Sequence, residues 1–182
     1  MKNPSKYATE REIASDILLQ TSAIATPLLS TFSAWLMAGL GAAFTLLVAN
    51  IDSIVKYVLA HNFRWALLWF AASLLTGLAA RFLSVVVSAS LTSNAVFSER
   101  LPKAIQAAPS FSLPAFKHFY FSGLFLPYKC VANKTFAKVQ RGDLMASHRL
   151  TAKASQLQAI LVLLQIVCST ASILVLASGV KV

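Results

Sequence analysis

Few residues of this chain have the types and spacing that catalysis requires. Ser53 and Lys56 match the Ser-x-x-Lys spacing of acyl-transferring serine enzymes, but the Ser-Asp-Asn and Lys-Thr-Gly motifs that accompany it are missing from the sequence. His61, His118 and His148 lie in three separate segments, without the His-x-x-x-His or paired-carboxylate spacing of metal sites. The sequence therefore predicts no catalytic residues, no metal site and no cofactor.

A single arginine interrupts the second apolar run. Arg81 stands in LLTGLAARFLSVVVSASL, residues 74–91, which contains no other charged residue. A guanidinium in hydrocarbon is costly, so such an arginine either reaches the headgroups with its long stem or faces a water-filled space. Two interpretations stay open. Arg81 lies at the inner headgroup level, or it lines a pore or anion site together with Ser84 and Ser88.

The composition places these residues in a membrane protein. Of the 182 residues, 57% are hydrophobic and 12% are charged, and the mean hydropathy is +0.68, whereas soluble domains carry about 25% charged residues. Three stretches reach the about 20 apolar residues that cross a bilayer, namely 23–49, 65–91 and 156–178. We therefore predict an all-α fold, a polytopic membrane bundle of three transmembrane helices. None of the three stretches contains Asp, Glu or His, which disfavours a proton-coupled transporter.

Lysine and arginine counts predict the orientation. Residues 1–22 carry three of these cations and residues 92–155 carry nine, whereas residues 50–64 carry two and the C-terminal end carries one. Because basic segments stay on the cytoplasmic side, we predict a multi-pass protein of the cell inner membrane with a cytoplasmic N-terminus. The runner-up topology has a fourth span within residues 109–128, which would move the C-terminus inside.

The remaining segments complete a single membrane domain, residues 1–182. Residues 1–22 are expected to form a cytoplasmic amphipathic helix, residues 50–64 an outer interfacial loop, and residues 92–155 a long basic cytoplasmic segment of helical and interfacial character. Aromatic residues concentrate at 109–128, as they do at membrane interfaces. The candidate docking surface for a protein partner consists of Phe116, Lys117, His118, Phe119 and Tyr120.

Small residues recur every four positions in the first two spans. Such stripes let helix backbones approach closely, and this close packing drives helix association in lipid. We expect these contacts inside one chain or between copies. The candidate packing residues are Ser30, Ala34, Ala38 and Ala42 in the first span, and Ala72, Thr76 and Ala80 in the second.

The net charge of +10 indicates an anionic partner. Headgroups of the lipid bilayer attract each nearby cation by roughly 1 kcal/mol, and nucleic acid is the weaker alternative. Three helices are too few for one chain to enclose a solute path, so the leading hypothesis is a non-enzymatic homo-oligomer. It would be a pore-forming or membrane-perturbing effector of a bacterial antiviral defence or toxin-type module. The alternative is an accessory, immunity or exclusion subunit that binds another membrane or cytoplasmic protein.

Overall fold

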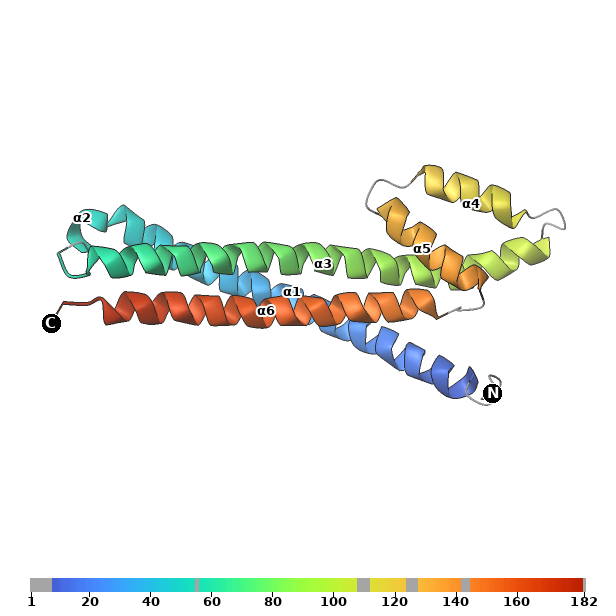
Figure 1. Ribbon diagram of the computed structural model, residues 1–182, viewed down its shortest axis with the longest axis horizontal. Coiled ribbons are helices and arrows are strands. Elements are labelled where there is room, and N and C mark those ends of the chain that lie inside the picture. The colour runs from blue at the N-terminus through green and yellow to red at the C-terminus, as the bar shows by residue number, and fades with distance from the viewer. Residues whose placement is uncertain (1–7, 55, 108–111, 124–127, 142–144, 182) are drawn as a thin grey trace. The chain divides into compact units, whose positions relative to one another are not determined.

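The computed structural model describes residues 8–54, 56–107, 112–123, 128–141 and 145–181. Nearly all of these residues are helical, and the strand-like pairing among them is one isolated bridge between Val58 and Val180. The predicted all-α class is confirmed. The helices of the described ranges are α1 (Ala8–Ala49), α2 (Ile51–Ile54), α3 (Ala60–Ala107), α4 (Leu113–Ser122), α5 (Tyr128–Gln140) and α6 (Ala146–Ser178) (Figure 1).

Three of these helices are long and apolar enough to cross a membrane. The qualifying segments are Ile13–Ala49 of α1, Ala60–Glu99 of α3 and Ala146–Ser178 of α6, with 37, 40 and 33 residues. Each exceeds the about 20 residues that the hydrocarbon core requires. The prediction of three helices long and apolar enough for a multi-pass membrane protein is therefore confirmed within the described residues.

The aromatic stretch at 109–128 contains the short helix α4. This helix has 10 residues, or about 15 Å of helical rise, which is half the thickness of a hydrocarbon core. Residues 109–111 and 124–127 of the stretch lie outside the described residues. The described part of the stretch is therefore too short to form the fourth span of the runner-up topology.

Residue contacts divide the chain into two compact units. The bundle unit comprises Ala23–Val87 and Ala154–Val182, and the second unit comprises Met1–Ser22 and Ser88–Lys153. The long helices α1, α3 and α6 contribute to both units, whereas α2 belongs to the bundle unit and α4 and α5 belong to the second.

In the bundle unit, α1 and α3 run antiparallel. The rings of Phe44 and Phe70 stack with their centroids 4.1 Å apart, and the sulfur of Met37 lies against Gly77. Later residues of α3 thus contact earlier residues of α1. This direction is the one expected of two consecutive membrane spans joined by a short turn.

The bundle unit buries polar side chains beside apolar ones and has a largely apolar surface. The large side chains Trp35, Leu75 and Leu163 are 74%, 68% and 62% exposed, so they form the surface that lipid would cover. Cys168 is buried on α6, and six other buried positions of α6 in the bundle unit alternate spacings of three and four residues, which is the heptad pattern of a left-handed coiled coil. These positions are Ser155, Gln158, Val162, Gln165, Ser169 and Ser172.

The turn between α1 and α3 is tied to the C-terminal end of α6. The backbone N–H of Leu59 donates to the carbonyl of Gly179 at 2.9 Å, and the side-chain amide of Asn62 donates to the carbonyl of Val175 at 3.2 Å. These bonds satisfy carbonyls that the last helical turn would otherwise leave open. Helix α3 begins at Ala60, just before the anchored Asn62. The helix therefore includes the last residues of the segment 50–64, which was predicted as an outer loop.

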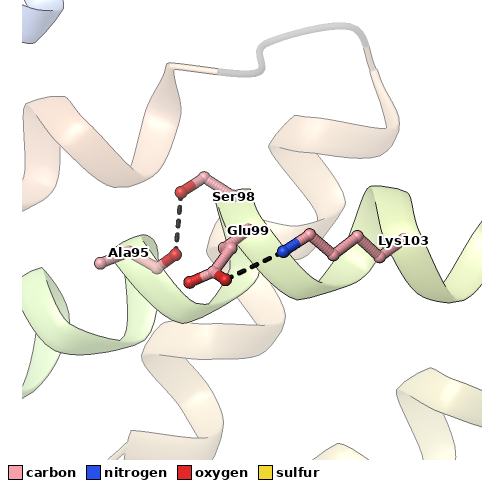
Figure 2. Close-up of polar contacts among 4 residues, drawn as sticks. All are labelled: Ala95, Ser98, Glu99 and Lys103. Carbon is pink, nitrogen blue, oxygen red and sulfur yellow. Dashed lines mark hydrogen bonds and ion pairs between the residues drawn. The ribbon is translucent and has the colours of Figure 1, made fainter.

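Beyond the bundle unit, α3 continues as a helix through a charged sequence. Lys103 Nζ donates to Glu99 Oε1 at 3.0 Å, and Ser98 Oγ donates to the carbonyl of Ala95 at 2.9 Å (Figure 2). An exposed ion pair four residues apart adds a few tenths of a kcal/mol to a helix. Local contacts therefore support this part of α3.

Polar contacts join the helix ends that form the second unit. Ser147 Oγ, at the start of α6, donates to Asn94 Oδ1 of α3 at 2.7 Å. His148 Nδ1 lies 3.7 Å from Asp16 Oδ1 of α1. The start of α6 therefore contacts both other long helices within this unit.

Candidate functional site

A set of paired polar side chains fills the centre of the bundle unit. The amide of Gln165 is fully buried, with Oε1 accepting from Ser33 Oγ at 2.7 Å and Nε2 donating to the carbonyl of Ser33 at 3.3 Å. A buried amide without such partners would cost several kcal/mol in an apolar environment. We call the whole set the polar ladder: Thr26, Ser33, Ser73, Ser155, Gln158, Gln165, Ser169 and Ser172.

The polar ladder continues from α6 to α3. Ser169 Oγ donates to the carbonyl of Gln165 at 2.7 Å, and Ser73 Oγ lies 2.8 Å from Ser169 Oγ. One turn further along α6, Ser172 Oγ donates to the carbonyl of Ala66 at 2.8 Å. These contacts run in opposite directions along the two helices, so α3 and α6 are antiparallel.

A second amide repeats the arrangement seven residues earlier in α6. Gln158 Nε2 donates to the carbonyl of Thr26 at 3.2 Å, and Thr26 Oγ1 lies 3.3 Å from Ser155 Oγ. Both glutamines bond to the α1 residue 132 positions before them, so α1 and α6 run parallel and in a fixed register. Gln158 Oε1 is buried and has no hydrogen-bond partner among the described residues.

The chemistry of the polar ladder is neutral. Amide and hydroxyl groups do not ionise near neutral pH, so the side chains of the ladder do not act as general acids or bases. Buried polar side chains in helical bundles do specify register, because a shifted helix would leave them unpaired. The arrangement therefore fixes how three spans of one chain fit together.

Sequence reasoning missed this set, although a signal was present. Gln158 and Gln165 stand seven residues apart in the last predicted span, and Thr26 and Ser33 stand seven apart in the first. A spacing of seven keeps side chains on one helix face, whereas a step of four rotates the position by about 40° each time. A stripe with a constant step of four therefore drifts away from an interface.

The candidate packing residues show this drift. Ala80 is buried at 1% exposure, and four others of the set are half-buried, whereas the last two positions of the α1 stripe are exposed. The stripe thus begins near the bundle interior and ends on its surface. The half-buried residues are Ser30, Ala34, Ala72 and Thr76, and the exposed ones are Ala38 and Ala42.

Arg81 points away from the bundle interior. Its side chain is exposed, whereas Ala80 before it and Ser84 three residues later are buried at 1% and 8% exposure. Ser88 is exposed. In the bundle unit, Arg81 on the outside of α3 is therefore separated from Ser84, which is buried against its neighbours.

The candidate docking residues lie on α4, in the second unit. The ring of Phe97 from α3 contacts those of Phe116 and Tyr120 edge-on, with centroids 6.0 and 5.2 Å apart. Phe119 is 74% exposed, and the exposed His118 lies edge-on to it at 5.9 Å. One face of α4 is thus held by α3 and another exposes Phe119 and His118, while the side chain of Lys117 lies outside the described part of the structure.

Burial also changes the chemistry of one docking residue. Desolvation raises the pKa of the Tyr120 hydroxyl above its ordinary value, because a phenolate is poorly stabilised away from water. Tyr120 therefore stays neutral at physiological pH and contributes packing.

The residues examined for catalysis are dispersed. Ser53 and Lys56 are both exposed near the α1–α3 turn, and His61 lies edge-on to Trp65 at 6.1 Å. In the part of the chain that the structure describes, no group of three or more His, Cys, Asp or Glu side chains is placed to hold a metal ion.

Comparisons with protein families, curated proteins and solved structures find no match to this chain. Function is therefore inferred from the polar ladder, from the outward Arg81 and from the surfaces of the second unit.

The contact between Gly77 and the polar ladder gives a stability prediction. A Cβ atom at Gly77 would lie 2.8 Å from Gln165 Nε2 and 2.9 Å from the sulfur of Met37. We expect Gly77→Ala to lower the free energy of unfolding by about 1–3 kcal/mol, because the held amide must move. The measurement is denaturation of the full chain in mixed micelles by increasing SDS.

Gly39→Ala is the matched control on α1. A Cβ atom at Gly39 would have no atom within 4 Å, and alanine favours a helix by up to about 1 kcal/mol over glycine. Gly39→Ala should be neutral or stabilising. Equal effects of the two substitutions would contradict the close approach of Gln165 to α3.

Proposed function

We propose that the protein is a non-enzymatic homo-oligomer of the bacterial inner membrane that perturbs the membrane as a pore-forming effector of antiviral defence or toxin type. The observation that carries the proposal is the outward position of Arg81 on a membrane-spanning helix. A guanidinium on that surface needs water, headgroups or a second protein surface. Copies arranged with this face of α3 toward a common axis would provide a shared polar lining.

The polar ladder supports a path between copies. The largest fully buried side chains are Gln158 and Gln165, which occupy the space between the three helices of one chain. Because these side chains pack closely, the ladder occupies the interior of a single bundle. A route for ions would therefore run along the outer surfaces of several bundles.

The exposed end of the small-residue stripe on α1 supports assembly. Ala38 and Ala42 are exposed, and Cβ atoms built at Gly39 and Gly41 would meet no atom within 4 Å. A surface of small residues lets a second helix approach closely, and this packing is a main source of helix association in lipid. In this arrangement, α1 supplies contacts between copies and α3 supplies the lining.

Depth along α3 fits an arginine that can reach water. Arg81 lies 21 residues after the start of α3 at Ala60, or about 32 Å of helical rise, close to the thickness of a hydrocarbon core. The lysine and arginine distribution supports a cytoplasmic N-terminus. Arg81 would then stand at the cytoplasmic mouth of the path.

Substitution of Arg81 tests this role. We expect the purified full chain to form a defined oligomer in mild detergent and to release potassium from lipid vesicles. Arg81→Leu should reduce the release rate at least about tenfold, because a charged lining group is removed, while the mass of the oligomer stays unchanged. Native mass spectrometry and a potassium-release assay measure the two properties.

Arg64→Leu is the matched control, since Arg64 is also exposed and lies on the same helix near its start. This variant should release potassium at the wild-type rate. Wild-type release from Arg81→Leu vesicles would refute the role of Arg81, and a strictly monomeric wild-type chain would refute the homo-oligomer.

A second candidate function is favoured by the free face of α4. Phe119 is 74% exposed and stands beside the exposed His118, on a helix that Phe97 holds in place from the opposite face. An exposed aromatic residue on a supported helix is typical of a protein-binding hot spot. In this role, the protein is an accessory, immunity or exclusion subunit that binds another protein through α4.

Gentle solubilisation tests the second function. A stoichiometric partner should copurify with the wild-type chain, and Phe119→Ala should reduce its recovery at least tenfold, because truncating a hot-spot aromatic costs 2 kcal/mol or more. Tyr57→Ala is the control, since Tyr57 is 65% exposed in the bundle unit. Recovery unaffected by Phe119→Ala would refute α4 as the docking surface.

A further inference from the structure

One acceptor of the polar ladder is unmatched. Gln158 is fully buried in the bundle unit, and its Oε1 has no hydrogen-bond partner among the described residues. Those residues include the whole bundle unit except positions 55 and 182, which are valines 29 residues after Thr26 and 24 residues after Gln158. A buried carbonyl oxygen normally accepts at least one hydrogen bond. This oxygen therefore needs a donor that the neighbouring side chains do not supply.

The orientation of the Gln158 amide is fixed by its nitrogen. Nε2 donates to the carbonyl of Thr26 at 3.2 Å. Exchange of the amide oxygen and nitrogen would place two acceptors at that distance, with no proton between them. The unmatched atom is therefore the oxygen. Gln165 differs, since Ser33 Oγ donates to its Oε1 at 2.7 Å.

An unmatched donor lies beside the same amide. Thr26 Oγ1 and Ser155 Oγ are 3.3 Å apart, and either atom can be the donor. The two hydroxyls carry two protons, and their mutual bond uses one of them. The second proton has no acceptor among the described residues, and it does not reach Gln158 Oε1. An unmatched donor and an unmatched acceptor thus lie in the same part of the ladder.

Helix α3 brings a further hydroxyl to this level. Gly77 of α3 lies against Gln165 of α6, and the two helices are antiparallel. Seven residues forward in α3 and seven back in α6, the same register pairs Ser84 with Gln158. Ser84 is buried at 8% exposure. A Cβ atom at Gly77 would lie 2.8 Å from Gln165 Nε2. Because serine has a Cβ atom, α3 must stand further from the Gln158 amide than from the Gln165 amide.

The two unmatched groups define the ligand. It must accept a proton from a hydroxyl and donate one to the amide oxygen of Gln158. A metal cation cannot accept a hydrogen bond, and a charged ligand without a counter-charge is costly between membrane spans. Water does both, and a buried water molecule typically makes about three hydrogen bonds to polar groups that are otherwise unsatisfied.

We propose that Thr26, Ser84, Ser155 and Gln158 form a binding site for one water molecule inside the bundle unit. The water donates to Gln158 Oε1, accepts from the second hydroxyl of the Thr26–Ser155 pair and bonds to Ser84 Oγ as a third partner. It completes the polar ladder at the level of Gln158, whereas direct bonds to Ser33 complete the ladder at the level of Gln165. The site does not depend on the proposed oligomer, because one chain supplies all four residues.

Water–amide contacts measured by NMR test the site in the full chain. The side-chain amide protons of Gln158 should show a rotating-frame cross-peak with water at least about fivefold stronger than those of Gln165, because a bound water lies beside the first amide alone. The protein would be deuterated, with isotope-labelled glutamine, in deuterated detergent. The sign of the cross-peak distinguishes this contact from proton exchange. Signals missing from Gln158→Met and from Gln165→Met assign the two amides.

Ser84→Ala and Ser73→Ala are a matched pair, since both replace a buried serine of α3. Ser84→Ala removes one partner of the water and should weaken the Gln158 cross-peak at least about threefold, whereas Ser73→Ala should leave it unchanged. Equal effects of the two substitutions would overturn the site. Equal water contacts at Gln158 and Gln165 in the wild-type chain would also overturn it, and this comparison stays valid if a variant fails to fold.

Replacement of sodium chloride by choline chloride distinguishes water from a bound cation. A water site predicts that the Gln158 amide signals keep their chemical shifts in both salts. Signals that follow the sodium concentration would overturn the water assignment in favour of a cation held by the same oxygens.

Discussion

The architecture of the bundle unit depends on the need of a buried amide for hydrogen-bond partners in an apolar environment. The side-chain amide of Gln165 bonds to both the side chain and the backbone of Ser33. The backbone carbonyl of Gln165 accepts from Ser169 Oγ. Because an unpaired amide is costly in lipid, the three helices are confined to the register in which these bonds form. The requirement for glycine at position 77 follows, since a larger residue would displace the amide. Polar pairs occupy much of the inner surface beside buried residues such as Phe44 and Val162, and many large apolar side chains face outward.

This inside-out pattern links the fold to the proposed functions. A bundle that satisfies its own polar groups has a surface free for other purposes, and Arg81 is the charged residue that the middle part of α3 places there. The small residues at the end of the α1 stripe allow a second bundle to approach. In the second unit, basic residues at the end of α5 and the start of α6 line a cavity. These surfaces can be altered without touching the polar ladder.

Composition and run length predicted the helical class and the three spans, because crossing a bilayer requires about 20 apolar residues whatever the fold. The interior of the bundle was harder to predict. Alanine and serine are so common in this chain that a step of four was easy to find, while the step of seven shared by Gln158 and Gln165 decided the contacts. Which residues of α4 face α3 depends on Phe97, far away in sequence, and the clustering of Lys138 with Arg149 depends on how two helices meet. Spacing within one segment does not contain such information.

The most direct test of the polar ladder is a double-mutant cycle between its two central residues. The free energies of unfolding of Ser33→Ala, Gln165→Leu and the double variant would be measured in lipid bicelles against the wild-type chain. Because the two side chains bond directly, we expect a coupling energy of about 0.6–1.7 kcal/mol, and a cycle of Gln165→Leu with Ser30→Ala should show a smaller one. Additive effects of Ser33→Ala and Gln165→Leu, within about 0.3 kcal/mol, would contradict a bundle organised around this amide.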